Sequence, residues 1–283
     1  VTNQLFNMNA NNQSANRFFE GEAKAPVIPS FQAAYVINDK WSVSGQFAIG
    51  GGGGKCEFDN GLPMFEELIG GAVAQNGGTS YALNQQLTGK QYFFGLQLGA
   101  TYRLAENFSV FGGVRGVLAS CGYEGAINGI KANGLTAADY SALSQQAAAG
   151  AQQAADAAAK YAAAGMAAEA AQYAAMAETL KGQAVQAGTV AAMIGDYNLD
   201  CSQSGFGITP IIGLDWNLGK LNLAAKYEFR TKIELENEST NSANVDALMP
   251  AYADGCKVRS DIPALLTLGA QYQITDAVRA MGG

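Results

Sequence analysis

The side chains that most often carry catalysis are scarce in this chain. There is no His among its 283 residues, which excludes within them a Ser-His-Asp or Cys-His site and a His-ligated zinc. Catalysis would have to use carboxylates, Lys or Tyr instead. We therefore expect no enzymatic activity, no cofactor and no metal site.

The cysteines are the second group with possible chemistry. The four are far apart and include no Cys-x-x-Cys pair: Cys56, Cys121, Cys201 and Cys256. An even count suits two disulfides in an oxidising compartment, and four free thiols are the alternative.

Composition narrows the class of protein. The net charge is −7, with only 17 Lys and Arg and no basic stripe, so we expect no nucleic-acid partner. Charged residues make up 14% of the chain, against roughly 25% in soluble domains. A mean hydropathy of +0.00 argues against a helical membrane protein, but a barrel with one apolar strand face averages to such a value.

Alternation with a period of two residues is the strongest structural pattern. In Gln91–Leu104 the even positions are apolar and the odd ones, apart from Phe93, are polar or small, which predicts a strand. Its length of about 14 residues exceeds the ~9–11 that a tilted barrel strand needs to cross a bilayer. Similar patterns occupy residues 31–37, 41–49, 108–121, 206–216, 221–235 and 264–274.

The connections between these strands are of two kinds that alternate. Tight turns near residues 38–40, 105–107, 217–220 and 275–277 separate long connections near 50–90, 125–195 and 237–261. In an up-and-down meander, all tight turns then share one end and all long loops the other, which is typical of outer-membrane barrels. The alternative is a soluble β-sandwich, in which loops of roughly 40–70 residues are uncommon.

An Ala-rich insert lies inside the second long connection. Residues 136–182 are rich in Ala, the best helix former. Thr136 and Asp139 predict a capping box, Gly182 a C-terminal stop, and Gly150 and Gly165 breaks between two or three helices.

One face of this insert carries its few large apolar side chains. With two residues of the third long connection they form the predicted capture groove: Met166, Tyr173, Met176 and Leu180, with Leu248 and Met249. The alternative is a low-complexity insert that packs only on itself.

Strand order also predicts which cysteines pair. Cys121 ends one strand and Cys201 begins the next at the long-loop end, so antiparallel pairing should bring them together. Cys56 and Cys256 remain and would join two long loops. We expect both bridges.

Five segments resemble the FadL/TodX family of outer-membrane transporters for long-chain fatty acids and other hydrophobic compounds. They are PSFQAAYVINDKWSVSGQF (29–47), LGATYRLAENFSVFGGVRG (98–116), SGFGITPIIGLDW (204–216), LAAKYEFRTKIEL (223–235) and DIPALLTLGAQYQITDAV (261–278). The order of tight turns, long loops and helical insert is also similar.

This resemblance implies an all-β fold, an antiparallel up-and-down transmembrane β-barrel. Residues 1–283 would be a fragment holding roughly eight of its ~14 strands, with 125–195 as a helical extracellular insertion and the family's N-terminal hatch upstream. The implied function is passive transport across the bacterial outer membrane. The implied partners are a long-chain fatty acid or other hydrophobic ligand and outer-membrane lipid, and a monomer is expected.

The resemblance also points to sites in the barrel wall. The third strand runs into a glycine run, and Ile49, Gly50, Gly51 and Gly52 match the family's lateral opening; a flexible hinge beyond the membrane is the alternative. Arg115, Lys226 and Arg230 are cationic candidates for a carboxylate headgroup. Structural ion pairs, for example with Glu228, are the alternative.

Two other functions compete with transport. A structural or adhesive barrel could display the Ala-rich helices to a partner. A barrel lipase or deacylase is less favoured, because the examples known to us use a Ser-His pair and this chain has no His.

Overall fold

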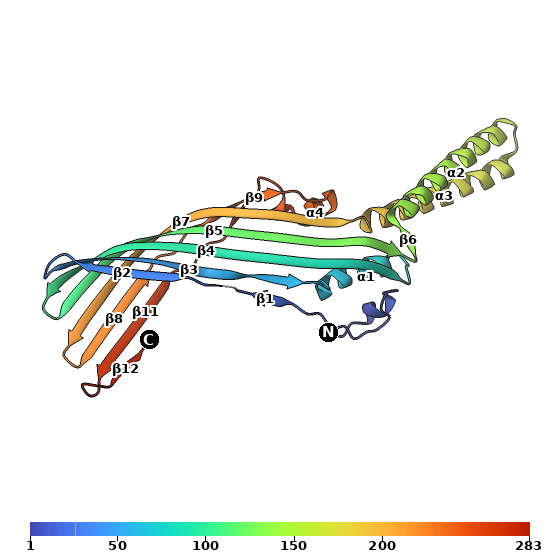
Figure 1. Cartoon of the computed structure of the whole chain (residues 1–283). Helices are drawn as coiled ribbons and strands as arrows, with labels where there is room; N and C mark the ends of the chain where they lie inside the picture. The colour runs from blue at the N-terminus through green and yellow to red at the C-terminus, as the bar shows by residue number, and fades with distance from the viewer. Residues whose placement is uncertain (26) are drawn as a thin grey trace.

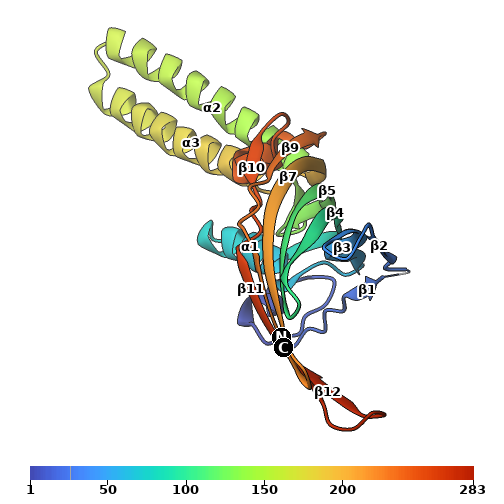
Figure 2. The ribbon, with the colours of Figure 1, turned by 90° about the vertical axis from the view of Figure 1, so that its left-hand side faces the viewer.

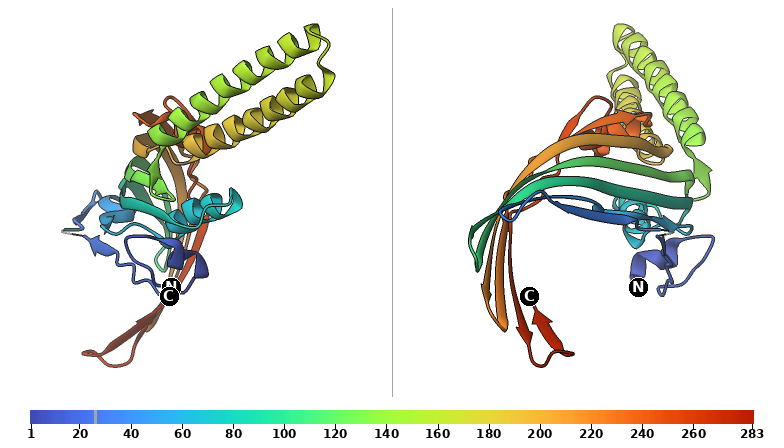
Figure 3. Two further views of the ribbon diagram at one scale, coloured as in Figure 1. Left: turned by 90° about the vertical axis from the view of Figure 1, so that its right-hand side faces the viewer. Right: turned by 60° about the vertical axis from the view of Figure 1, so that its left-hand side comes forward.

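A single curved antiparallel sheet dominates the computed structural model, which describes residues 1–25 and 27–283 (Figure 1). In that part of the chain twelve strands form the sheet. Eight of them follow the path β1-β3-β4-β5-β7-β8-β11-β12, and β2, β6, β9 and β10 pair beside this path. Their bounds are β1 (Glu22–Lys24), β2 (Ser30–Val36), β3 (Trp41–Phe58), β4 (Tyr81–Ala105), β5 (Phe108–Ala132), β6 (Leu135–Thr136), β7 (Tyr197–Leu218), β8 (Leu221–Glu228), β9 (Glu234–Ser239), β10 (Lys257–Arg259), β11 (Leu265–Gln273) and β12 (Arg279–Gly282). Figure 3 shows the sheet curling into a half-barrel, which confirms the predicted all-β antiparallel architecture.

The two faces of the sheet differ as the alternation predicts. In β4 the outward side chains of Leu96 and Leu98 are 56% and 57% exposed, whereas Phe93 on the inner face is 7% exposed. Gln97 also lies on the inner face, where its side chain oxygen accepts a hydrogen bond from Arg115. The outer face is therefore apolar and the inner face mixed and polar.

Tight turns gather at one end of the sheet and the long connections at the other (Figure 1). The strands are longer than the alternation indicated, because β4 and β5 pair from Ala105–Phe108 up to Tyr81–Ala132. The ladder therefore occupies part of what the sequence assigned to long connections, and β5 continues past residue 125. No helix in the described residues combines the length and apolar character needed to cross a membrane.

The alternation in 221–235 is not continuous, contrary to the sequence prediction. Five residues, 229–233, separate β8 from β9, and they face only four residues, 207–210, of β7. This extra residue is a bulge, and an odd insertion exchanges the two faces of a strand. Ile233 and Leu235 therefore point inward and pack with Phe93 and Val117, while Glu234 lies on the outer side.

The Ala-rich insert is a helical hairpin that projects away from the sheet (Figure 2). It consists of α2 (Ala137–Ala163) and α3 (Ala167–Met193), separated at Gly165, whose φ is +76°. The predicted capping box is present, with the Thr136 side chain accepting from Asp139 N and Asp139 from Thr136 N. The predicted break at Gly150 and stop at Gly182 are wrong, since both lie inside helices that Ala sustains. At 27 residues each, the helices are about 40 Å long.

Short elements close the long-loop end. They are η1 (Gln4–Met8), α1 (Pro63–Gln75), α4 (Ala243–Leu248) and η2 (Pro250–Tyr252). Ile69 and Val73 of α1 pack with Tyr81 of β4, Ile130 of β5 and Ile194 after α3 in one buried cluster. This cluster positions α1 over the inner face of the strand ends and fixes the base of the hairpin.

Candidate functional site: an apolar cavity at the long-loop end

An apolar cavity of about 410 Å³ lies between α1, α4 and the ends of three strands. This volume is within the range of small-molecule sites, roughly 300–1,000 Å³. Its walls are apolar side chains and backbone, and Tyr197 is the one lining side chain that carries a polar group. The lining residues are Met64, Phe65 and Leu68 of α1, Leu87 of β4, Gly125–Ile127 of β5, Tyr197 and Leu199 of β7, and Val245, Leu248 and Met249. Such a lining buries hydrocarbon and has no means of chemical reaction.

Local sequence explains why two helices flank this cavity. Pro63 starts α1, where its missing N–H costs nothing, and Phe65, Ile69 and Val73 follow at helical spacing. α4 is held against β7 because Ser242 N donates to Asn198 O at 2.8 Å and Asn198 N donates to Ser242 Oγ at 3.0 Å. The cavity is therefore built from anchored elements.

A buried carboxylate fastens α1 to the N-terminal segment. Glu66 is 2% exposed and accepts hydrogen bonds from Arg17 Nη1 at 2.9 Å, the Tyr81 hydroxyl at 2.9 Å, Asn9 Nδ2 at 3.2 Å and Gln85 Nε2 at 3.3 Å. Burial, together with the charge of Glu66, raises the pKa of Tyr81 above its usual range. The phenol therefore remains a donor to Glu66 at neutral pH.

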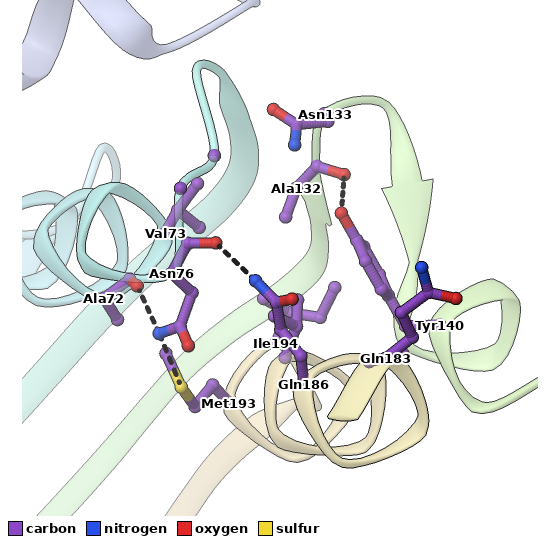
Figure 4. A pocket seen from close by; sticks show the side chains of 14 residues that line it. Ala72, Val73, Asn76, Ala132, Asn133, Tyr140, Gln183, Gln186, Met193 and Ile194 are labelled. Atoms are coloured by element: carbon purple, nitrogen blue, oxygen red, sulfur yellow. Dashed lines mark hydrogen bonds between the residues drawn. The ribbon is translucent and has the colours of Figure 1, made fainter. Parts of the chain in front are cut away.

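A smaller cavity of about 280 Å³ separates α1 from the base of the hairpin (Figure 4). Gln186 Nε2 donates to Asn76 O and Asn76 Nδ2 to the Met193 sulfur, each at 3.5 Å. The Tyr140 hydroxyl donates to Ala132 O at 3.3 Å. These contacts tie α2 and α3 to α1 and β5.

The predicted groove residues are not all brought together. Leu248 and Met249 line the apolar cavity. The other four lie along the hairpin, where the ring of Tyr173 stacks on Tyr161 with centroids 5.2 Å apart and Leu180 packs over Gly150. Met166 and Met176 are exposed. None of these four lines the apolar cavity.

The predicted cations lie beside carboxylates. Arg115 makes two hydrogen bonds with Glu228, at 2.7 and 3.0 Å, and Lys226 Nζ lies 2.7 Å from the same carboxylate. Arg230 pairs with Asp261, which also binds Arg259 at 2.6 Å. Each carboxylate therefore holds two cations, and both clusters keep a positive charge.

The glycine run is a kinked strand and not a loop. Residues 41–58 form one strand, β3, with register shifts between Ile49 and Gly51 and between Gly52 and Gly54 in its pairing with β4. Gly52 has φ +67° and Gly53 φ +96°. On its other side, β3 pairs with β2 up to Ala48 and with β1 from Lys55, so the kink lies in the interval between these two ladders.

Both predicted disulfides are wrong, and all four thiols are free. Cys201 is opposite Tyr123, and Cys121 is opposite Gln203. The two cysteines are therefore diagonal neighbours, about 7–8 Å apart, beyond the usual limit of ~7 Å for a bridge. Cys56 is in β3 and Cys256 precedes β10, so β4, β5, β7 and β9 separate them.

Comparisons with known proteins return structures and no sequence relatives. No protein-family model matches the chain, and no curated protein is significantly similar in sequence. A FadL homologue from Pseudomonas aeruginosa is similar with a TM-score of 0.46 and 12% identity, over 88% of this chain and 46% of that one. The Ralstonia pickettii toluene transporter TbuX is similar with a TM-score of 0.45 and 13% identity, over 91% and 57%.

The chain thus spans about half the length of the solved structures it matches. The first of them carries the name of the family that the sequence motifs resemble, and the second is a transporter. The fold itself places the chain in the class of antiparallel β-barrel proteins, because its sheet is curled, has an apolar outer face and carries cavities at its long-loop end.

Sequence reasoning did not identify α1 or Glu66. The signal for the helix was present, because Pro63 precedes an apolar pattern at positions 65, 69 and 73. No local signal marks Glu66, since its partners come from residues 9, 17, 81 and 85.

Proposed function

We propose that this chain is part of an outer-membrane transporter for hydrophobic molecules, among them the long-chain fatty acids that the family resemblance implies. The apolar cavity between α1 and α4 is the observation that carries the proposal, because it is placed at the long-loop end of a sheet whose outer face is apolar. Capture of an alkyl chain there needs no energy source, since each buried CH₂ contributes about 0.8 kcal/mol.

Binding of a homologous series of ligands tests this proposal. With the chain in phosphatidylcholine nanodiscs, affinity for alkyl ligands should rise about fourfold per added carbon, from ~0.8 kcal/mol per CH₂, until the cavity is full. Replacing the half-exposed Leu248 by Asp puts a charge in the cavity wall and should weaken binding at least tenfold.

The matched control is Leu143→Asp, which changes a similarly exposed leucine on the hairpin and should leave affinity unchanged. Equal loss in both variants, or no dependence on chain length in the parent protein, would contradict capture in this cavity.

The exit route in the proposal is the kink of β3 at Ile49–Gly52. A Cβ added at Gly52 would lie 2.1 Å from the carbonyl oxygen of Gln91, and a left-handed backbone strains any other residue. We expect Gly52→Ala to move the kink and to reduce the uptake rate of a fluorescent alkyl probe into proteoliposomes several-fold. Gly112→Ala is the control, because Gly112 lies in β5 outside the kink and no atom lies within 4 Å of its added Cβ. Equal uptake by the two variants would argue against this route.

A display function is the second candidate, and the hairpin favours it. It projects about 40 Å from the sheet (Figure 2), and its predicted groove residues do not line the cavity. Removing residues 136–182 while alkyl binding persists would support display to a partner as the role of the hairpin.

A further inference from the structure

A second cavity, of about 500 Å³, adjoins the apolar one and has a different lining. Its walls are rich in side-chain amides from the N-terminal segment, the turn after β3 and the ends of β4 and β5, among them Asn9, Asn60, Gln85 and Asn128. Amides offer both donors and acceptors and carry no charge. The cavity is therefore suited to a polar, uncharged group.

The amide-lined cavity and the apolar cavity are neighbours along three elements. On α1, Phe65 lines the apolar cavity and Glu66 lines the amide-lined cavity. On β4, Leu87 lines the apolar cavity and Gln85 lines the amide-lined cavity. Ala126 of β5 lines both. Residues two apart on a strand are about 7 Å apart, so one amphipathic molecule can reach both cavities.

Unpaired polar atoms are concentrated at the amide-lined cavity. Arg17 Nε, Gln85 Oε1 and Asn128 Oδ1 are buried without a hydrogen-bond partner, and in the described residues only Ser239 Oγ shares this condition. Buried polar groups in native proteins nearly always have a partner. A bound group that both accepts and donates hydrogen bonds would therefore satisfy these atoms, which are one donor and two acceptors.

Charge decides which headgroup fits. Arg17 is paired with Glu66 at 2.9 Å, and Asp59 also lines the cavity, so its charged side chains sum to −1. The amide nitrogen of Gln85 is held by Glu66, which leaves its oxygen free. A carboxylate only accepts hydrogen bonds and would be repelled here, whereas hydroxyl groups both accept and donate.

We infer that the two cavities together bind an amphipathic molecule with an alkyl tail and an uncharged, hydroxyl-rich headgroup, such as a sugar or polyol, in preference to a free fatty acid. This inference rests on the proposed capture of alkyl chains and specifies the substrate class. The tail occupies the apolar cavity, and the hydroxyls bind Arg17 Nε, Gln85 Oε1 and Asn128 Oδ1.

Paired ligands of equal tail length test the inference. With the chain in phosphatidylcholine nanodiscs, decyl glucoside below its micelle concentration should bind about tenfold more tightly than decanoate, as expected for two or three added hydrogen bonds. Gln85→Leu and Asn128→Leu should each weaken glucoside binding several-fold and leave decanoate binding unchanged or improved. Gln75→Leu, at an exposed position of α1 outside both cavities, is the matched control.

The inference would be overturned if the parent protein bound decanoate as tightly as decyl glucoside, or more tightly. This comparison uses only the parent protein, so it holds even if a variant fails to fold. Glucoside binding that neither variant weakens would also overturn the inference, because it would mean that the amide-lined cavity holds water only. Absence of binding by both ligands would instead refute the proposed capture function, so the two failures are distinguishable.

Discussion

Replacing Glu66 by alanine is expected to release the N-terminal segment from the barrel end. The change removes the common acceptor of Arg17, Asn9, Tyr81 and Gln85 and leaves the Arg17 guanidinium largely buried without its counter-charge. Removing one partner of a buried ion pair costs about 3–5 kcal/mol. Amide exchange in residues 1–17 and in the first turns of α1 should therefore accelerate by a factor of roughly 100 to 4,000, at 1.4 kcal/mol per factor of ten.

Hydrogen exchange followed by mass spectrometry in nanodiscs measures this effect. Glu67→Ala is the control, because this neighbouring carboxylate accepts one exposed hydrogen bond from Asn3 Nδ2, and an exposed change of this kind usually alters stability by under ~0.5 kcal/mol. Unchanged protection of residues 1–17 in Glu66→Ala would show that other contacts hold this segment. Ligand binding should also weaken, since α1 forms a wall of both cavities.

The parts of this structure that the sequence predicts are those with a local cause. The alternation in 91–104 follows from an apolar outer face and a crowded inner face. Successive residues of a strand point to opposite faces, so adjacent residues are enough to show both. The Thr136–Asp139 capping box and the tight turns depend on only a few consecutive residues. Such features are readable because no distant residue is needed to specify them.

The features that sequence reasoning missed depend on register and distant partners. The bulge at 229–233 exchanges the two faces of a strand, and its cause is a mismatch of one residue with β7. The same sensitivity defeats the disulfide prediction, because a displacement of two residues separates Cys121 from Cys201. Neither displacement can be recognised from the residues of the strand itself, because each depends on the register with a neighbouring strand. The glycine run is paired with β4 as a kinked strand, and its role as a lateral opening stays a prediction.

The ion pairs of the inner face lead to the second large expected effect, in Glu228→Ala. This carboxylate is buried and forms ion pairs with both Arg115 and Lys226. Without it, two like charges remain side by side on the inner face. We expect the free energy of unfolding to fall by about 3 kcal/mol, seen as a lower urea midpoint of the reconstituted protein. Glu234→Ala, at an exposed carboxylate 3.4 Å from Lys257, is the control and should change little.

A double variant separates loss of a buried pair from loss of side-chain volume. Arg115→Leu with Glu228→Leu removes both members of the closest pair and leaves Lys226, which is exposed and can be solvated. Because apolar replacements of a whole buried ion pair are often neutral or stabilising, this variant should recover most of the stability that Glu228→Ala loses. A double variant as unstable as Glu228→Ala would contradict a charge effect and assign the loss to packing.

If the cations instead served to bind a carboxylate headgroup, Glu228→Ala would raise decanoate affinity and Arg115→Leu alone would lower it. The same variants therefore also decide whether Arg115 acts in ligand binding or in stabilising the sheet.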